Sequence, residues 1–181
     1  MREPRTSEAR ARLLATATRI FYTEGIHSVG IDRIVAEAQI TRATLYRHFP
    51  GKEDLVVAYL TEADQAIRAH VERARADGLT PVEVARAIAH GIADDIRTPG
   101  FRGCAFLNAA SEYPDPAHPV HQAVLVHRQW FLDTVSELLP EPAARHFVLL
   151  RDGAMASGCL NDPQSVCETF LLGVEGILTT A

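Results

Sequence analysis

The stretch IDRIVAEAQITRATLYRHFPGKEDL, residues 31–55, decides the fold of this chain. Apolar residues recur in it at helical spacing on both sides of a short gap, which predicts two short helices over residues 31–38 and 41–48. Thr41 stands where the N-cap of the second helix belongs. Two short helices whose apolar faces can pack on each other across a tight turn indicate a helix-turn-helix.

The second helix of this pair is too small to be mainly a core element. Leu45 and Phe49 account for its apolar side, which leaves donors suited to phosphates and base edges pointing outward. At the start of the next helix, a lysine and free backbone amides can hold a phosphate together. An ordinary solvated face is the alternative to DNA contact for all of these side chains. The candidate DNA-binding residues are Arg42, Thr44, Tyr46, Arg47, His48 and Lys52.

The charge of the chain is unevenly distributed. Residues 1–52 carry nine basic and five acidic side chains, a local charge of +4, although the whole chain of 181 residues has a formal net charge of −5. A basic N-terminal module on an acidic body can approach DNA with one end only. The first arginines are either solubilising charge or contacts to phosphates and the minor groove, namely Arg2, Arg5, Arg10 and Arg12.

The rest of the chain also has helical periodicity. With 47% hydrophobic and 7% aromatic residues, and few β-branched runs, it predicts an all-α protein of about nine helices. A first helix with apolar residues from Leu13 to Phe21 ends at Gly25. Beyond the helix-turn-helix, helices are expected at residues 52–76, 81–96, 101–113, 119–139, 142–160 and 163–180, with a proline loop at 114–119.

Over about residues 10–55 the chain resembles the tetracycline-repressor-like (TetR/AcrR) family of bacterial transcription regulators. The resemblance rests on several residue types at fixed offsets, namely Phe21-x-x-x-Gly25, Ile34, Ala38, Thr41, Thr44-Leu45-Tyr46, His48-Phe49 and Lys52-x-x-Leu55. Three positions depart from the family pattern. Gln39 stands in the turn and Ala43 in the recognition helix where the family commonly has glycine, and Val29 replaces a capping threonine, so that Ser28 or Gly30 must serve instead.

The resemblance implies a three-helix helix-turn-helix head, residues 1–51, followed by a roughly six-helix body, residues 52–181, that dimerises and binds a small effector. It further implies a homodimer that binds a palindromic operator in double-stranded DNA and releases this DNA when the effector binds. A member of this family acts most often as a repressor. Two alternatives are a dimeric regulator without a small-molecule effector and, from another class, a helical enzyme or ligand carrier. No cofactor is expected.

Three body helices, at residues 82–96, 101–113 and 120–138, bring aromatic bulk together with a few polar groups. We expect a mainly apolar cavity between them for an apolar or aromatic effector, although such residues are also common in a plain core. The candidate ligand-binding residues are Cys104, Leu107, Asn108, His127, Trp130 and Phe131.

The last two helices have more apolar surface than one acidic chain should expose, which predicts an isologous four-helix interface between two copies. Glycines within them suggest close helix approach, namely Gly153, Gly158, Gly173 and Gly176. The candidate interface residues are Phe147, Leu150, Ala154, Phe170, Val174 and Ile177.

Several function classes lack their signatures. Three cysteines without a CxxC argue against a disulfide framework or a zinc site, and His118 and His121 have metal-like spacing but no third ligand nearby. No catalytic motif accompanies them, so an enzyme is not expected. The absence of an 18-residue apolar run and of a signal-like N-terminus predicts a cytoplasmic protein without a membrane partner.

Overall fold

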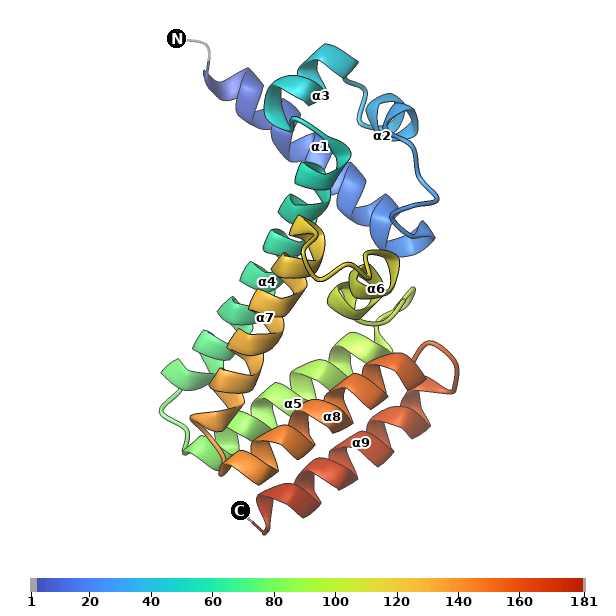
Figure 1. Cartoon of the computed structure of the whole chain (residues 1–181). Coiled ribbons are helices and arrows are strands. Elements are labelled where there is room, and N and C mark those ends of the chain that lie inside the picture. Colours follow the sequence, from blue (N-terminus) through green and yellow to red (C-terminus); the bar gives the residue numbers. More distant parts are fainter. Residues whose placement is uncertain (1–2, 181) are drawn as a thin grey trace. The chain divides into compact units, whose positions relative to one another are not determined.

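The computed structural model describes residues 3–180, with side chains from residue 8 onward, and this part of the chain is entirely helical. The described range contains nine helices, which are labelled in Figure 1: α1 (Glu3–Glu24), α2 (Ile31–Glu37), α3 (Arg42–His48), α4 (Lys52–Ala76), α5 (Pro81–Arg97), α6 (Ala105–Glu112), α7 (Pro119–Ser136), α8 (Glu141–Ser157) and α9 (Pro163–Leu178). The expected all-α class is confirmed. None of these helices has the length and apolar character needed to cross a bilayer.

The chain forms two compact units. Unit 1 contains the residues up to Ala63 together with Ala105–Val124, and unit 2 contains Asp64–Cys104 together with the residues from Leu125 on. Both α4 and α7 therefore begin in unit 1 and end in unit 2. The division differs from the expected boundary after residue 51, because α6 and the first turns of α7 belong to the same unit as the helix-turn-helix.

The core of unit 1 is made by the stripes that the apolar periodicity predicted. Leu13 and Ile20 of α1, Ile34 of α2 and Leu45 of α3 have no exposed surface, and Leu55 of α4 is equally buried. Each fully buried aliphatic side chain contributes roughly 1.5–3 kcal/mol of transfer free energy. This core fixes the orientation of two helices that are too short to be stable alone.

Local hydrogen bonds set the ends of α2 and α3. The Thr41 hydroxyl accepts from the Thr44 backbone amide at 3.1 Å, which confirms the expected N-cap of α3. Gly30 is the N-cap residue of α2 and makes no side-chain cap bond. Ser28 instead donates its hydroxyl to the Glu24 carbonyl at 2.6 Å. Of the two residues that could replace a capping threonine, the structure therefore uses the glycine.

The turn between α2 and α3 forms at Gln39 without glycine. Gln39 has a φ of +53°, the only positive φ of a non-glycine residue in the described range. Its amide donates to the Ala36 carbonyl at 3.1 Å, and the Ile40 amide donates to the Val35 carbonyl at 3.2 Å. These two bonds make a Schellman C-cap, a motif whose left-handed residue is usually glycine. The departure at Gln39 therefore changes the cost of the turn and leaves its geometry intact.

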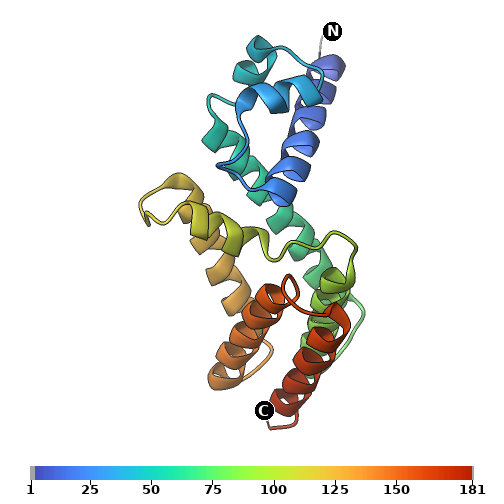
Figure 2. The ribbon, with the colours of Figure 1, turned by 90° about the vertical axis from the view of Figure 1, so that its right-hand side faces the viewer.

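Unit 2 is built around α5, α8 and α9, which pack against one another (Figure 1). Figure 2 shows α8 and α9 as the last two helices of the chain in orange and red. The rings of Phe147 on α8 and Phe170 on α9 are 6.4 Å apart in an edge-to-face arrangement. At Gly158, an added Cβ would lie 2.7 Å from Ile96 Cγ2 on α5. This glycine therefore permits the close approach that its position in the sequence suggested.

Replacing Gln39 by glycine should raise the free energy of unfolding by about 1 kcal/mol. A left-handed conformation costs an L-residue roughly 1–2 kcal/mol, and the greater freedom of glycine in the unfolded chain offsets part of the gain. Urea denaturation of Gln39→Gly measures the difference. Gln39→Ala is the control, because it keeps the Cβ and should give no gain. Equal gains in both variants would contradict the strain at this turn.

Candidate functional site

The outward side of α3 has few interactions within unit 1. Leu45 is the buried residue of this helix, while Arg42, Ala43 and Arg47 are exposed and Tyr46 is 50% exposed. Guanidinium and phenol groups on an exposed helix can reach phosphates and base edges. The surface of α3 therefore has the chemistry of a major-groove reader.

Two of the candidate DNA contacts already have partners. The Thr44 hydroxyl lies 2.9 Å from that of Thr41, so one of its hydrogen bonds is used inside the helix cap. Arg42 donates to Asp32 on α2 in an ion pair with both side chains largely exposed. Exposed ion pairs contribute little to stability. Arg42 can therefore exchange this carboxylate for a phosphate at little cost.

His48 differs from the other candidates. Its Nε2 is enclosed by the protein and has no hydrogen-bond partner among the described residues. Burial lowers the pKa of His48, and the charges of Arg47 and Arg10 lower it further. The ring is therefore biased to its neutral form, and Nε2 is not available to DNA in this conformation. The expected DNA contact of His48 stays a prediction that needs a side-chain movement.

Lys52 is the first residue of α4 and is half-buried. Burial lowers the pKa of its ammonium group, and the negative charge of Glu112 partly opposes this shift. A cation at the first turn of a helix lies beside free backbone amides, which is the arrangement that holds a phosphate.

Arg10 is the one N-terminal arginine whose side-chain contact is described, and its guanidinium on α1 lies 5.0 Å above the Phe49 ring. Arg2 and the side chain of Arg5 lie outside the described residues.

Glu112 has a structural role in unit 1 that the sequence did not predict, since its type and position suggested only a polar group near a pocket. Its carboxylate accepts from the backbone amides of Ile26 and His27 at 2.8 Å and 2.5 Å. These amides follow Gly25, whose φ of +91° ends α1. Charge-assisted bonds of this kind are roughly twice as strong as neutral ones. The C-terminus of α6 thereby holds the loop that enters α2, an arrangement that no local sequence signal indicates.

The candidate ligand-binding residues fall into two sets. Leu107 and Asn108 lie on α6 in unit 1, whereas Cys104, His127, Trp130 and Phe131 lie in unit 2. In unit 2 the His127 ring is 5.7 Å from Trp130 and 6.5 Å from Phe131. The Nδ1 atom of His127 hydrogen-bonds Asp64 at 2.7 Å. Burial lowers the pKa of His127 to about 4, against the raising effect of Asp64, so this imidazole is neutral at physiological pH.

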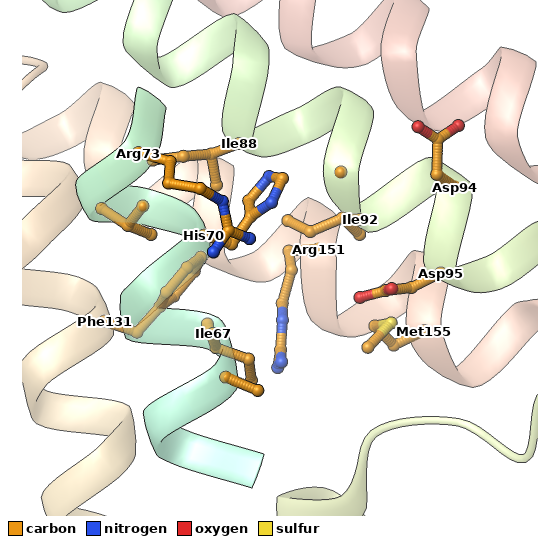
Figure 3. Close-up of a pocket in the computed structure, with 13 residues that line it drawn as sticks. Ile67, His70, Arg73, Ile88, Ile92, Asp94, Asp95, Phe131, Arg151 and Met155 are labelled. Atoms are coloured by element: carbon orange, nitrogen blue, oxygen red, sulfur yellow. The ribbon is translucent and has the colours of Figure 1, made fainter. Parts of the chain in front are cut away.

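Unit 2 contains a cavity of about 330 Å³ between α4, α5, α7 and α8 (Figure 3). Its wall combines apolar side chains with cationic and acidic ones, including Ile67, His70, Arg73, Ile88, Ile92, Asp95, Phe131, Arg151 and Met155. Of the candidate ligand-binding residues, Phe131 alone lines it. In this cavity, α4 and α8 supply the walls that the sequence assigned to α6 and Trp130. The expected cavity beside α6 and Trp130 stays a prediction.

Arg151 is a functional candidate that sequence reasoning missed. It is 5% exposed on α8 and donates to Asp152 at 2.8 Å and to the Cys104 sulfur at 3.3 Å. The guanidinium lies 5.4 Å from the centre of the Phe131 ring. In the sequence, nothing distinguishes this arginine from the other charged residues of the amphipathic helix α8. Only the packing of α8 shows that it points into the interior of unit 2.

The candidate dimer residues are mostly inside the chain. Phe147, Phe170 and Val174 are at most 3% exposed and Ala154 is 6% exposed, so they belong to the core shared by α8 and α9. This corrects their assignment to an outer surface, because the faces that carry them pack on each other and on α5. Leu150 and Ile177 keep partial exposure. The open apolar residues on these helices are Leu149 at 67% and Leu172 at 76%.

The four glycines of α8 and α9 divide in the same way. Gly158 and Gly173 face neighbours, since a Cβ at Gly173 would lie 3.1 Å from a Leu150 methyl group. At Gly153 and Gly176, an added Cβ would meet nothing within 4 Å. Close packing inside this chain therefore explains two of the glycines and leaves the other two on open helix surface.

Comparison with known proteins adds to this geometry. The family described as bacterial regulatory proteins, tetR family, matches residues 13–59. SCO4454, a TetR-family transcriptional regulator from Streptomyces coelicolor, has a crystal structure that is 68% identical, covers 96% of each chain and has a TM-score of 0.94. The HTH-type transcriptional regulator YjdC of Escherichia coli (strain K12) is 24% identical over 95% of this chain and 94% of its own length.

A more distant structure shares the fold alone. The multidrug binding protein EbrR, solved in complex with malachite green, is 21% identical over 93% of this chain and 96% of that one, with a TM-score of 0.72.

Lys52→Ala and Tyr46→Phe should weaken DNA binding with little change in stability, since each removes a group from the outer surface of the helix-turn-helix. For Lys52→Ala, the slope of log K against log salt should fall by about 0.9 for each phosphate that the variant no longer neutralises. Filter binding or fluorescence anisotropy measures both, on a duplex that the protein selects from a random pool. Arg145→Ala is the control, because Arg145 is exposed on α8 in unit 2. Unchanged affinity and slope in both head variants would refute this surface.

Proposed function

The chain belongs to the tetR family of bacterial regulatory proteins and is a DNA-binding transcriptional regulator; we propose that it is a repressor that binds a palindromic operator as a homodimer and leaves it when a small molecule occupies the cavity of unit 2. In this proposal, residues 1–51 are the DNA-binding domain and residues 52–181 the effector and dimerisation domain. The protein acts in the cytoplasm, where operator DNA lies.

The observation that carries the proposal is the continuity of α4. This helix runs unbroken from Lys52, on the candidate DNA surface, to Ala76, and its residues from Ala66 to Arg73 line the cavity. A ligand can shift DNA binding only if it binds one conformation more tightly than another. A helix that contributes to both places can change position with the ligand and take Lys52 with it. The complex of EbrR with malachite green supports a small-molecule role for this fold.

Dimerisation is supported by the outer surface of α8 and α9. A groove on it is lined by Leu149, Leu150 and residues of α9 such as Val166, and Leu172 adds a side chain that is 76% exposed. Gly153 and Gly176 leave room above the same helices for another backbone to approach. A second copy related by a two-fold axis would cover this apolar surface and pair two α3 helices with the two halves of a palindrome.

Leu172→Glu should convert the dimer to a monomer at micromolar concentration. The side chain is largely exposed in the single chain, so the charge costs little in the monomer and is strongly unfavourable when a second copy buries it without a partner. Sedimentation velocity gives the oligomeric state.

Val126→Glu is the matched control for this variant, because Val126 is 64% exposed on α7 rather than on α8 or α9. It should leave the oligomeric state unchanged. A Leu172→Glu protein that still sediments as a dimer would show that the interface lies elsewhere.

The repressor function is tested by selection followed by titration. Fragments that the protein selects from a random pool should contain an inverted repeat with half-site centres about one helical turn, roughly 34–36 Å, or a multiple apart. A ligand found by thermal shift should weaken binding to that fragment by about 5- to 150-fold, the usual range of allosteric coupling. The fragment must weaken the ligand by the same factor, because the coupling is reciprocal.

Ligands that bind the protein and leave DNA affinity unchanged would favour the dimeric regulator without a small-molecule effector. Selected fragments without an inverted repeat would contradict the palindromic operator.

A further inference from the structure

The chemistry of the cavity in unit 2 goes beyond a general effector site, and the inference below rests on the proposed function. One part of its wall is apolar, formed by Ile67, Ile88, Ile92, Phe131 and Met155. Its volume of about 330 Å³ is near the lower end of the roughly 300–1,000 Å³ typical of small-molecule sites. The occupant is therefore small and mainly apolar.

The polar part of the wall centres on Arg151. In Figure 3 its side chain extends through the cavity between Phe131 and Asp95. This side chain is 5% exposed, and its Nε atom is buried without a hydrogen-bond partner among the described residues. A buried donor without an acceptor is unfavourable. The Nε atom is enclosed in this conformation, as His48 Nε2 is, so a ligand acceptor reaches it only with a movement of the Arg151 side chain, and the unmet donor favours that movement.

The charges around Arg151 leave an excess of positive charge. Asp152 accepts from Arg151 at 2.8 Å and from Arg128 at 2.7 Å, so one carboxylate serves two cations. The other hydrogen bond of the guanidinium is to the Cys104 sulfur at 3.3 Å, and a thiol is a weak acceptor without charge. Buried charge favours a counter-ion strongly. The excess therefore points to an anion rather than to a neutral acceptor.

The other charged groups of the cavity wall also favour a bound anion. Arg73 adds a second cation, which Figure 3 shows directed into the same space. Asp94 pairs with Arg97 at 3.4 Å and is 77% exposed, so its charge is turned to solvent. Asp95 is the one acidic side chain near Arg151 within this wall; burial raises its pKa, and the charges of His70 and Arg151 oppose this shift.

We propose that the cavity binds a small apolar carboxylate, whose carboxylate oxygens accept hydrogen bonds from Arg151 Nε, with Arg73 as the second cation and with the apolar body against Phe131, Ile67 and Ile92. Charge-assisted bonds to a guanidinium are strong and directional. A matched amide keeps the shape and one acceptor but lacks the charge. An amine of the same shape would meet two cations and only one buried carboxyl group.

Isothermal titration calorimetry on the full chain without DNA tests this inference. The probes are phenylpropionate and octanoate, each with the amide and the amine of the same carbon skeleton. We expect at least one carboxylate to bind ten times or more tightly than its amide, and the amine to bind most weakly. Arg151→Gln should remove most of the difference between carboxylate and amide. Arg73→Gln should reduce it several-fold, and Arg145→Gln, an exposed arginine outside the cavity, should leave it unchanged.

Other outcomes overturn the inference. Equal binding of carboxylate and amide would show an apolar site, preference for the amine would show a site read through Asp95, and no binding by any probe at millimolar concentration would exclude this ligand class. If Arg151→Gln does not fold, the carboxylate-to-amide ratio of the unmodified protein and the exposed Arg73→Gln variant decide the question.

The same probes separate this inference from the proposed function. A carboxylate that binds through Arg151 and leaves DNA affinity unchanged supports the ligand class and contradicts the effector role. An amide that binds as well as its carboxylate and releases DNA contradicts the ligand class and supports the effector role.

Discussion

The proposed use of α3 as a reading helix depends on one constraint, which is that a helix of seven residues is not stable by itself. A single turn of helix is costly to nucleate, and α3 has one fully buried side chain, Leu45, to keep it in place. The Thr41 cap and the Schellman turn at Gln39 supply the remaining restraints. Because few groups of α3 face inward, Arg42, Ala43, Tyr46 and Arg47 stay exposed. The shortness that makes α3 unstable alone therefore leaves most of its side chains on the surface that we propose contacts DNA.

In unit 2 the unfavourable feature is buried charge, since charged side chains lie where an apolar core would be more stable. Replacing a buried ion pair by apolar residues is often neutral or favourable for stability. Arg151 with Asp152, and His127 with Asp64, therefore add little to the stability of this helical unit. They give it directional groups at fixed positions. A site that must recognise one class of small molecule needs such groups, and a core that serves only to dimerise does not.

The local features of this structure were predictable and the long-range ones were not. Periodicity and turn residues predicted the all-α class, the stripes from Leu13 to Leu45 and the Thr41 cap, because each depends on neighbours a few positions apart. Glu112 binds amides 85 and 86 residues away, and Arg151 meets Cys104 across 47 residues. No periodicity encodes such pairs. The same limit explains why Phe170 and Val174 were placed on an outer surface: an apolar stripe does not say which of two partners covers it.

The carboxylate of Glu112 also limits how regulators of this kind can be recombined. The unit that contains the helix-turn-helix is assembled from two segments with some forty residues of the other unit between them. A head cut out after Gly51 would leave the Ile26 and His27 amides without their acceptor. Exchange of heads between relatives by a single crossover would join one protein's entry loop to another protein's α6. Chimeras that are to keep the loop into α2 in its place must therefore inherit both segments from one parent.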